Sequence, residues 1–171
     1  MATSLRLAEH ADARAIHQIM TIAGQTAATP DLYFVDTLEF VEQHIAYEGF
    51  IVVALVEAEL AGFQIVRLPG MAEDNLGREL GLKESELRLV AHVESAAVLP
   101  THRGHGIQRA MIAEAERLLL GLGYRWLMCT VHPENEHSLR NLTALGYSIV
   151  ATKDKYGSYR RHVMMKALTT A

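Results

Sequence analysis

The most informative stretch of the chain runs from residue 98 to residue 109 and reads Val98-Leu99-Pro100-Thr101-His102-Arg103-Gly104-His105-Gly106-Ile107-Gln108-Arg109. It combines the end of an apolar strand, a turn with two glycines and the start of a helix. Gly104 and Gly106 allow a tight turn whose backbone N–H groups are not covered by a Cβ atom. The helix that follows leaves its first N–H groups without intrahelical partners and carries partial positive charge at that end. The stretch therefore predicts an anion site, most naturally for a phosphate or pyrophosphate.

Two other phosphate-binding motifs that contain glycines are absent from the sequence. The chain has no Gly-Lys-Ser/Thr sequence, so a Walker-type phosphate loop is excluded. The third glycine of a dinucleotide-binding fingerprint is also missing, and the turn lies late in the chain. A plain strand-to-helix turn without a ligand stays open as the structural alternative.

The segment before the turn, residues 87–99, is predicted to be one long strand that Pro100 ends, because proline cannot donate to a ladder. Alternation then divides its side chains between two faces. One face carries His92, Glu94, Ala96 and Val98, and the other carries Val93, Ser95, Ala97 and Leu99.

Apolar spacing elsewhere predicts strands over residues 5–7, 50–56, 60–68, 126–131, 147–151 and 162–168. Helices are expected over residues 12–23, 35–46, 107–122 and 136–145. Residues 69–86 are expected to form a long loop with one or two helical turns, next to the strand that carries Glu94. Repeats and linkers are absent from the sequence, which predicts a single α+β domain over residues 1–171.

Composition excludes several classes of protein. Sixteen Lys and Arg against twenty Asp and Glu give a net charge of −4, which argues against a nucleic-acid-binding surface. The strongest apolar run, Phe50 to Val56, is far shorter than the roughly 20 residues that span a membrane. A single Cys excludes an intramolecular disulfide framework, and without an export signal it predicts a cytoplasmic protein.

In context, the turn resembles the acyl-CoA signature of the GNAT superfamily of N-acyltransferases, Arg/Gln-x-x-Gly-x-Gly/Ala. The signature aligns with residues Arg103-Gly104-His105-Gly106-Ile107-Gln108, and Ala97 to Pro100 resemble the strand that leads into it. A second region, Asn135 to Leu139 followed by Ala144 to Tyr147, is similar to the family's Asn-x-x-Ala…Lys-x-Gly-Phe segment. The resemblance implies a mixed, mostly antiparallel twisted sheet of six to seven strands flanked by helices. It also implies acetyl-CoA as co-substrate and an amine acceptor, either a small molecule or a peptide.

The resemblance also assigns roles to residues. The loop from Arg103 to Gln108 would hold the pyrophosphate, and Asn135 the pantetheine arm, alongside its role as a helix cap. Backbone groups of Ala96 and Val98 would hold the same arm, with the Val98 N–H as a donor to the oxyanion. Two departures stand out: Gln108 replaces a small residue, and Leu142 occupies the position of the family's acid-supplying Tyr.

Glu94 is the first candidate for the general base, since the family carries an acidic residue at this place in the strand. Its alternative role is an ion pair with Arg88, Arg67 or another neighbour. His92 is the second candidate, because an imidazole titrates near neutral pH; its alternative is an ordinary hydrogen-bonded histidine. Tyr147, Tyr156 and Tyr159 are candidate acids.

No metal is expected, because His102, His105, His132 and His137 have no recognised ligand spacing. Cys129 is expected to be a small buried residue rather than a nucleophile. The hypothesis is an acetyl-CoA-dependent N-acetyltransferase that works by direct attack in a ternary complex. A catalytically silent acyl-CoA-binding or sensor domain and a generic ligand-binding α+β domain stay open, as does a homodimer.

Overall fold

The computed structural model describes residues 2–155 and 157–169, and this part of the chain holds seven strands in one mixed sheet. Their order is β1-β2-β3-β4-β5-β7-β6, and only the β4–β5 pair has a parallel register. The predicted α+β class with a mostly antiparallel sheet is confirmed. The strands are β1 (Thr3–Leu7), β2 (Gly49–Val56), β3 (Glu59–Arg67), β4 (Val90–Val98), β5 (Trp126–Val131), β6 (Ser148–Lys155) and β7 (Tyr159–Ala167).

Five α-helices and three short 3₁₀ helices join the strands in the described part of the chain. They are η1 (His10–Asp12), α1 (Ala13–Gln25), α2 (Leu38–Ala46), η2 (Leu76–Leu80), α3 (Glu84–Leu87), η3 (Pro100–His102), α4 (Ile107–Gly121) and α5 (Glu136–Ala144). No helix in this part is long and apolar enough to cross a bilayer. By its internal contacts the chain divides into two compact units, Met1–Arg67 with Glu94–Ala115, and Leu68–Val93 with Glu116–Ala171.

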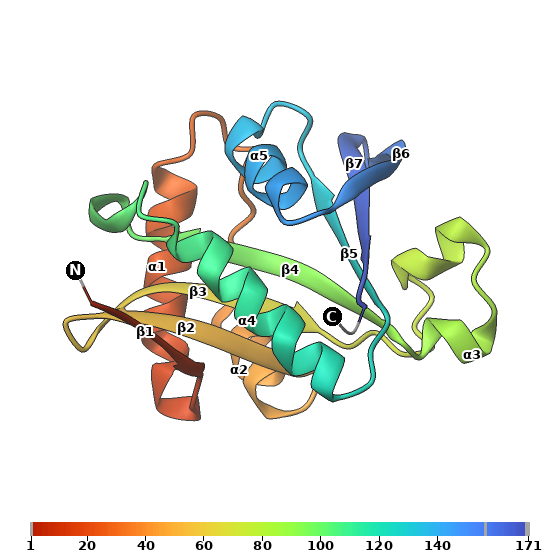
Figure 1. Ribbon diagram of the computed structural model, residues 1–171. Helices are drawn as coiled ribbons and strands as arrows, with labels where there is room; N and C mark the ends of the chain where they lie inside the picture. Colours follow the sequence, from red (N-terminus) through yellow and green to blue (C-terminus); the bar gives the residue numbers. More distant parts are fainter. Residues whose placement is uncertain (1, 156, 170–171) are drawn as a thin grey trace. The chain divides into compact units, whose positions relative to one another are not determined.

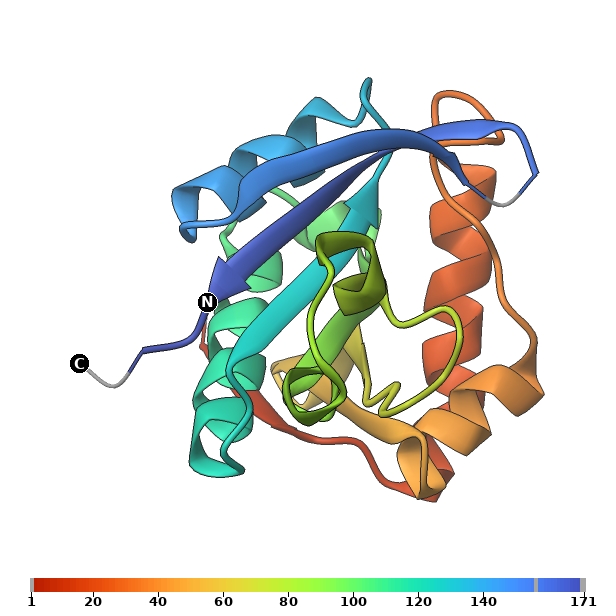
Figure 2. The same cartoon turned by 90° about the vertical axis from the view of Figure 1, so that its right-hand side faces the viewer.

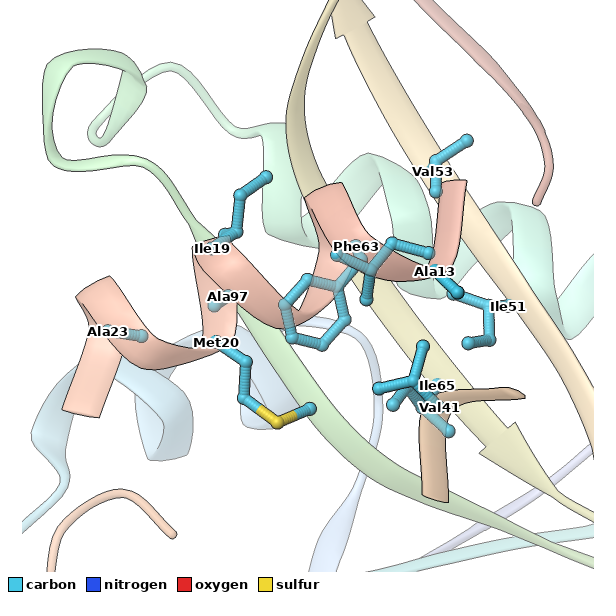
Figure 3. Packing of buried hydrophobic residues seen from close by; sticks show 11 residues of the cluster. Ala13, Ile19, Met20, Ala23, Val41, Ile51, Val53, Phe63, Ile65 and Ala97 are labelled. Carbon is cyan, nitrogen blue, oxygen red and sulfur yellow. The ribbon is translucent and has the colours of Figure 1, made fainter. Parts of the chain in front are cut away.

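In the first unit, α1 and α2 cover one face of β2 and β3 (Figure 1). Helix α1 forms because its apolar residues recur every three to four positions and thus face one side. That stripe packs on both strands, on α2 and on β4, and Figure 3 shows Phe63 among the side chains of this core. The cluster consists of Ala13, Ile16, Ile19, Met20, Ala23, Val41, Ile51, Val53, Phe63, Ile65 and Ala97.

The predicted strands over residues 50–56 and 60–68 form a hairpin, β2 and β3, whose turn contains neither Gly nor Asn. Glu57 and Ala58 both take positive φ angles, 52° and 71°, which non-glycine residues rarely adopt. A two-residue turn needs this backbone twist to match the twist of the strands. Both strands are largely buried, and the hydrogen bonds between them therefore hold the turn in this conformation.

In the second unit, the start of β4 pairs with β5, and β5 continues to β7 and β6. Val90, Met128 and Val163 form its core with Leu76, which comes from the segment between β3 and β4. Figure 2 shows this segment in yellow-green as a folded lobe, and the expected helical turns are η2 and α3. Its Glu79 carboxylate pairs with Lys153, at 3.2 Å, and with Lys155, both on β6.

Several predicted boundaries were wrong. Residues 87–89 do not belong to β4, because the N–H groups of Glu86 and Leu87 both bond to the Lys83 carbonyl at 2.9 Å and close a helical turn. Helix α2 starts at Leu38, where the Thr37 hydroxyl caps the Phe40 N–H at 3.1 Å. Strands β6 and β7 extend through the polar residues 152–155 and 159–161, whose cross-strand pairing needs no apolar pattern.

Candidate functional site

The glycine turn has the predicted strand–turn–helix form and lies wholly within the first unit. Gly104 and Gly106 have φ angles of +82° and +74°, and no atom lies within 4 Å of where a Cβ would stand. Both glycines and His105 are exposed, whereas Ile107 is buried and anchors the first turn of α4. The Gly106 carbonyl accepts the Ala110 N–H at 3.0 Å, so Gly106 caps the helix. Exposed backbone at a helix N-terminus fits a pyrophosphate.

The Arg103 side chain braces this turn. Its Nε donates to the Val98 carbonyl at 3.1 Å, and its Nη2 donates to the Thr26 hydroxyl at 3.1 Å. The guanidinium thereby ties the turn to the end of β4 and to the C-terminal end of α1. In this arrangement Arg103 contributes to the anion site mainly by fixing the shape of the turn.

Glu94, Ala96 and Val98 lie on the half of β4 that belongs to the first unit. The β4–β5 register covers Val90 to His92 only, so these three residues lie beyond it. Glu94 is exposed, and its carboxylate lies 3.9 Å from a guanidinium nitrogen of Arg67. The ion pair that was the alternative role of Glu94 is therefore present, but at a distance and exposure that make it weak.

His92 lies in the second unit and is only 3% exposed. Its Nε2 accepts the Leu76 backbone N–H at 3.1 Å, which assigns the ring proton to Nδ1. The lone pair that a general base would use is thus engaged by the inserted segment. This geometry favours the alternative role of His92, an anchor for the segment 69–89.

Substitution of His92 by Ala should lower the free energy of unfolding by about 1–3 kcal/mol, because the buried Leu76 N–H loses its acceptor. Chemical denaturation measures this change, with the exposed Glu94→Gln as a control that stays within about 0.5 kcal/mol. A stable His92→Ala protein that loses its catalytic rate would instead identify His92 as the base.

Asn135, also in the second unit, caps α5, since its Oδ1 accepts the Ser138 N–H at 3.1 Å. The cap uses the amide oxygen, so the role implied for the pantetheine arm would fall to the amide NH₂ group. Leu142 on the same helix is buried at 4% exposure and packs as an ordinary apolar residue.

The candidate acids differ in their surroundings. Tyr147 is buried, and burial together with the nearby Glu116 carboxylate raises the pKa of its phenol. Tyr159 is 50% exposed at the start of β7, with the Arg161 guanidinium 5.5 Å from its ring centroid. Tyr156 lies outside the described residues.

Cys129 is buried in β5, as expected for a small apolar residue. Across residues 2–155 and 157–169, no group of three or more His, Cys, Asp or Glu side chains is placed to hold a metal ion. His102 and His132 instead make local hydrogen bonds with Thr101 Oγ1, at 2.9 Å, and the Glu134 N–H, at 3.1 Å.

The sequence analysis missed two residues of the segment between α1 and α2. The Tyr33 hydroxyl and Ser95 Oγ are 2.9 Å apart, and burial raises the pKa of this phenol. Asp36 is half-buried, and burial followed by the charge of Glu94 raises the pKa of its carboxyl group to about 6. The one available signal was an acid directly after the apolar pair Phe34-Val35.

The fold and the glycine turn fit the class of the acyl-CoA-dependent acyltransferases. The sequence profile of the Acetyltransferase (GNAT) family matches residues 16–147, and the chain belongs to this family. A search of curated proteins finds no match.

Solved structures share the fold over nearly the whole chain. Phosphinothricin acetyltransferase from Sinorhizobium meliloti, in complex with acetyl-CoA, is 20% identical with a TM-score of 0.75, over 98% of this chain and 89% of that one. Ard1 from Thermoplasma volcanium is 18% identical with a TM-score of 0.75, over 99% and 100%. The ribosomal-protein-S18-alanine N-acetyltransferase from Escherichia coli is 16% identical with a TM-score of 0.74, over 99% and 96%.

Proposed function

We propose that the protein transfers an acetyl group from acetyl-CoA to a primary amine, by direct attack of the amine within a ternary complex. The observation that carries this proposal is the exposed glycine turn at the N-terminus of α4, in a chain of the GNAT family. The acetyl-CoA in the Sinorhizobium meliloti phosphinothricin acetyltransferase supports the choice of co-substrate.

In this proposal, residues of the first unit bind acetyl-CoA and accept the proton of the amine. N–H groups of the turn from Arg103 to Gln108 bind the pyrophosphate, with His105 and Ile107 at its centre. Backbone groups of Ala96 and Val98 bind the pantetheine arm, and the Val98 N–H donates to the oxyanion that forms during attack. Glu94 accepts a proton from the amine, directly or through a water molecule.

Departure of the thiolate needs no tyrosine at position 142. A thiol has a pKa near 8.5, so the sulfur of CoA can leave as a thiolate that is protonated later by solvent. The buried Leu142 is compatible with such a mechanism. The names of two structural relatives, a phosphinothricin acetyltransferase and a ribosomal-protein-S18-alanine N-acetyltransferase, support small molecules and peptides as candidate acceptors here.

A panel of amines with acetyl-CoA, read out by release of the CoA thiol, tests the proposal. We expect release that depends on both enzyme and acceptor for at least one amine of the panel. Gln108, where the family signature has a small residue, favours a second candidate, a silent acyl-CoA-binding domain. That candidate predicts thermal stabilisation by acetyl-CoA and no thiol release with any amine.

A further inference from the structure

The segment between α1 and α2 carries Asp36, and both the carbonyl and the N–H group of its backbone contact side chains of α1. The Asp36 carbonyl oxygen lies 3.1 Å from His17 Nε2, and the Asp36 N–H lies 3.2 Å from the sulfur of Met20. Both contacts are made by α1, in the same compact unit. These contacts with α1 therefore fix the backbone position of Asp36.

The same segment is attached to β4. The hydroxyl of Tyr33 forms a hydrogen bond with Ser95 Oγ, and the ring of Tyr33 packs against the core of the first unit. Ser95 directly follows Glu94 in the strand. The bond thus brings the segment to the part of β4 that carries the proposed base.

The bond between Tyr33 and Ser95 brings the segment that carries Asp36 to the part of β4 that carries Glu94. Burial, followed by the charge of Glu94, raises the pKa of the Asp36 carboxyl group. Among the residues that the structure describes, the Asp36 carboxylate has no hydrogen-bonding or ion-pair partner. Glu94 lies nearer to a cation, Arg67, and is more exposed. Asp36 is thus a second carboxylate near the proposed base, and pairs of carboxylates are a usual basis for acid–base catalysis.

We propose that Asp36 is a second proton-accepting carboxylate of the acceptor site and acts together with Glu94 on the amine. The inference rests on the proposed N-acetyl transfer. The acceptor enters as an ammonium ion, and one of its protons passes to the carboxylate pair. The nitrogen lone pair then forms the C–N bond, the C–S bond breaks, and its electron pair leaves with sulfur. The second proton leaves the nitrogen for the thiolate or solvent.

The test is the pH profile of kcat/KM for Asp36→Asn. We expect kcat/KM near neutral pH to fall at least about tenfold, a fraction of the full effect of acid–base catalysis. We also expect the acidic limb of the profile to move to lower pH, because the variant lacks the carboxyl group whose pKa is raised to about 6. Asp36→Glu, which keeps a carboxylate, should recover part of the rate. Glu39→Gln, an exposed change on α2, should have no effect.

Thermal stability provides a second readout. The pKa of Asp36 is raised from 3.8 to about 6, so its contribution to stability is full at low pH and is lost as pH rises through about 6. Asp36→Asn should therefore have a higher Tm than wild type at pH 8, whereas loss of a structural carboxylate would lower the Tm.

Each outcome decides a different question. If wild type transfers acetyl groups, and Asp36→Asn has the same kcat/KM and acidic limb, Asp36 takes no part in the reaction while the proposed function stands. A lowered Tm in Asp36→Asn with both kinetic properties retained would assign it a structural role. If wild type acetylates no amine, the proposed function falls, and this inference falls with it.

Discussion

Replacement of Glu94 by Gln should lower kcat/KM for the acceptor about 100- to 10,000-fold at neutral pH, the range typical of positioned acid–base catalysis. The substitution keeps the shape of the side chain and removes the charge that is proposed to accept the proton of the amine. The loss should shrink at high pH, where more of the amine is already neutral. Initial rates of thiol release, measured with saturating acetyl-CoA across pH, give the profile.

Arg67→Gln is the matched comparison for this variant. The Arg67–Glu94 pair is 3.9 Å long and partly exposed, so its loss should change stability by less than about 1 kcal/mol. If Glu94 acts as a base, Arg67→Gln keeps most of the rate that Glu94→Gln loses. Equal losses in the two variants would mean that the ion pair, and not proton transfer, is what the reaction needs.

The largest expected effect on binding comes from Gly104→Val combined with Gly106→Val. Side chains at these positions would cover the exposed N–H groups and disfavour positive φ angles. We expect the affinity for acetyl-CoA, measured by titration calorimetry, to fall by at least about 100-fold, which corresponds to about 2.7 kcal/mol.

Gly81→Val combined with Gly123→Val is a close control for backbone strain. These glycines also have positive φ angles, +69° and +87°, with no atom within 4 Å of a Cβ. Both double variants should lose similar stability, but the control should bind acetyl-CoA like wild type. Unchanged affinity in the Gly104/Gly106 variant would show that the turn does not bind the pyrophosphate.

The sequence was sufficient to predict the glycine turn because strand end, turn and helix start are contiguous. Gly104 and Gly106 have the positive φ angles that the turn requires, and Ile107 starts the helix as expected. The start of β4 was misplaced by three residues for an equally local reason. The N–H groups of Glu86 and Leu87 close a single helical turn on the Lys83 carbonyl. One turn is too short for its apolar residues to show a helical spacing that differs from that of a strand.

Contacts between residues that lie far apart in the sequence could not be predicted from the sequence pattern. Tyr33 and Ser95 are 62 residues apart, and only the packing of α1 and α2 on the sheet brings them together. The Nε2 of His92 meets the Leu76 N–H because the inserted segment folds back onto β4. The strand pattern alone placed His92 and Glu94 on one face, yet His92 is buried with its Nε2 on the Leu76 N–H, whereas Glu94 is exposed near Arg67.

Transfer of an isotope-labelled acetyl group from acetyl-CoA, followed by mass spectrometry of both the amine and the intact protein, tests the central claim most directly. The account predicts that the label appears on the amine in step with thiol release, and that protein incubated without acceptor stays unlabelled. A labelled protein that later passes the acetyl group to the amine would contradict direct attack. Bound acetyl-CoA with no label on any amine would contradict the enzymatic function itself.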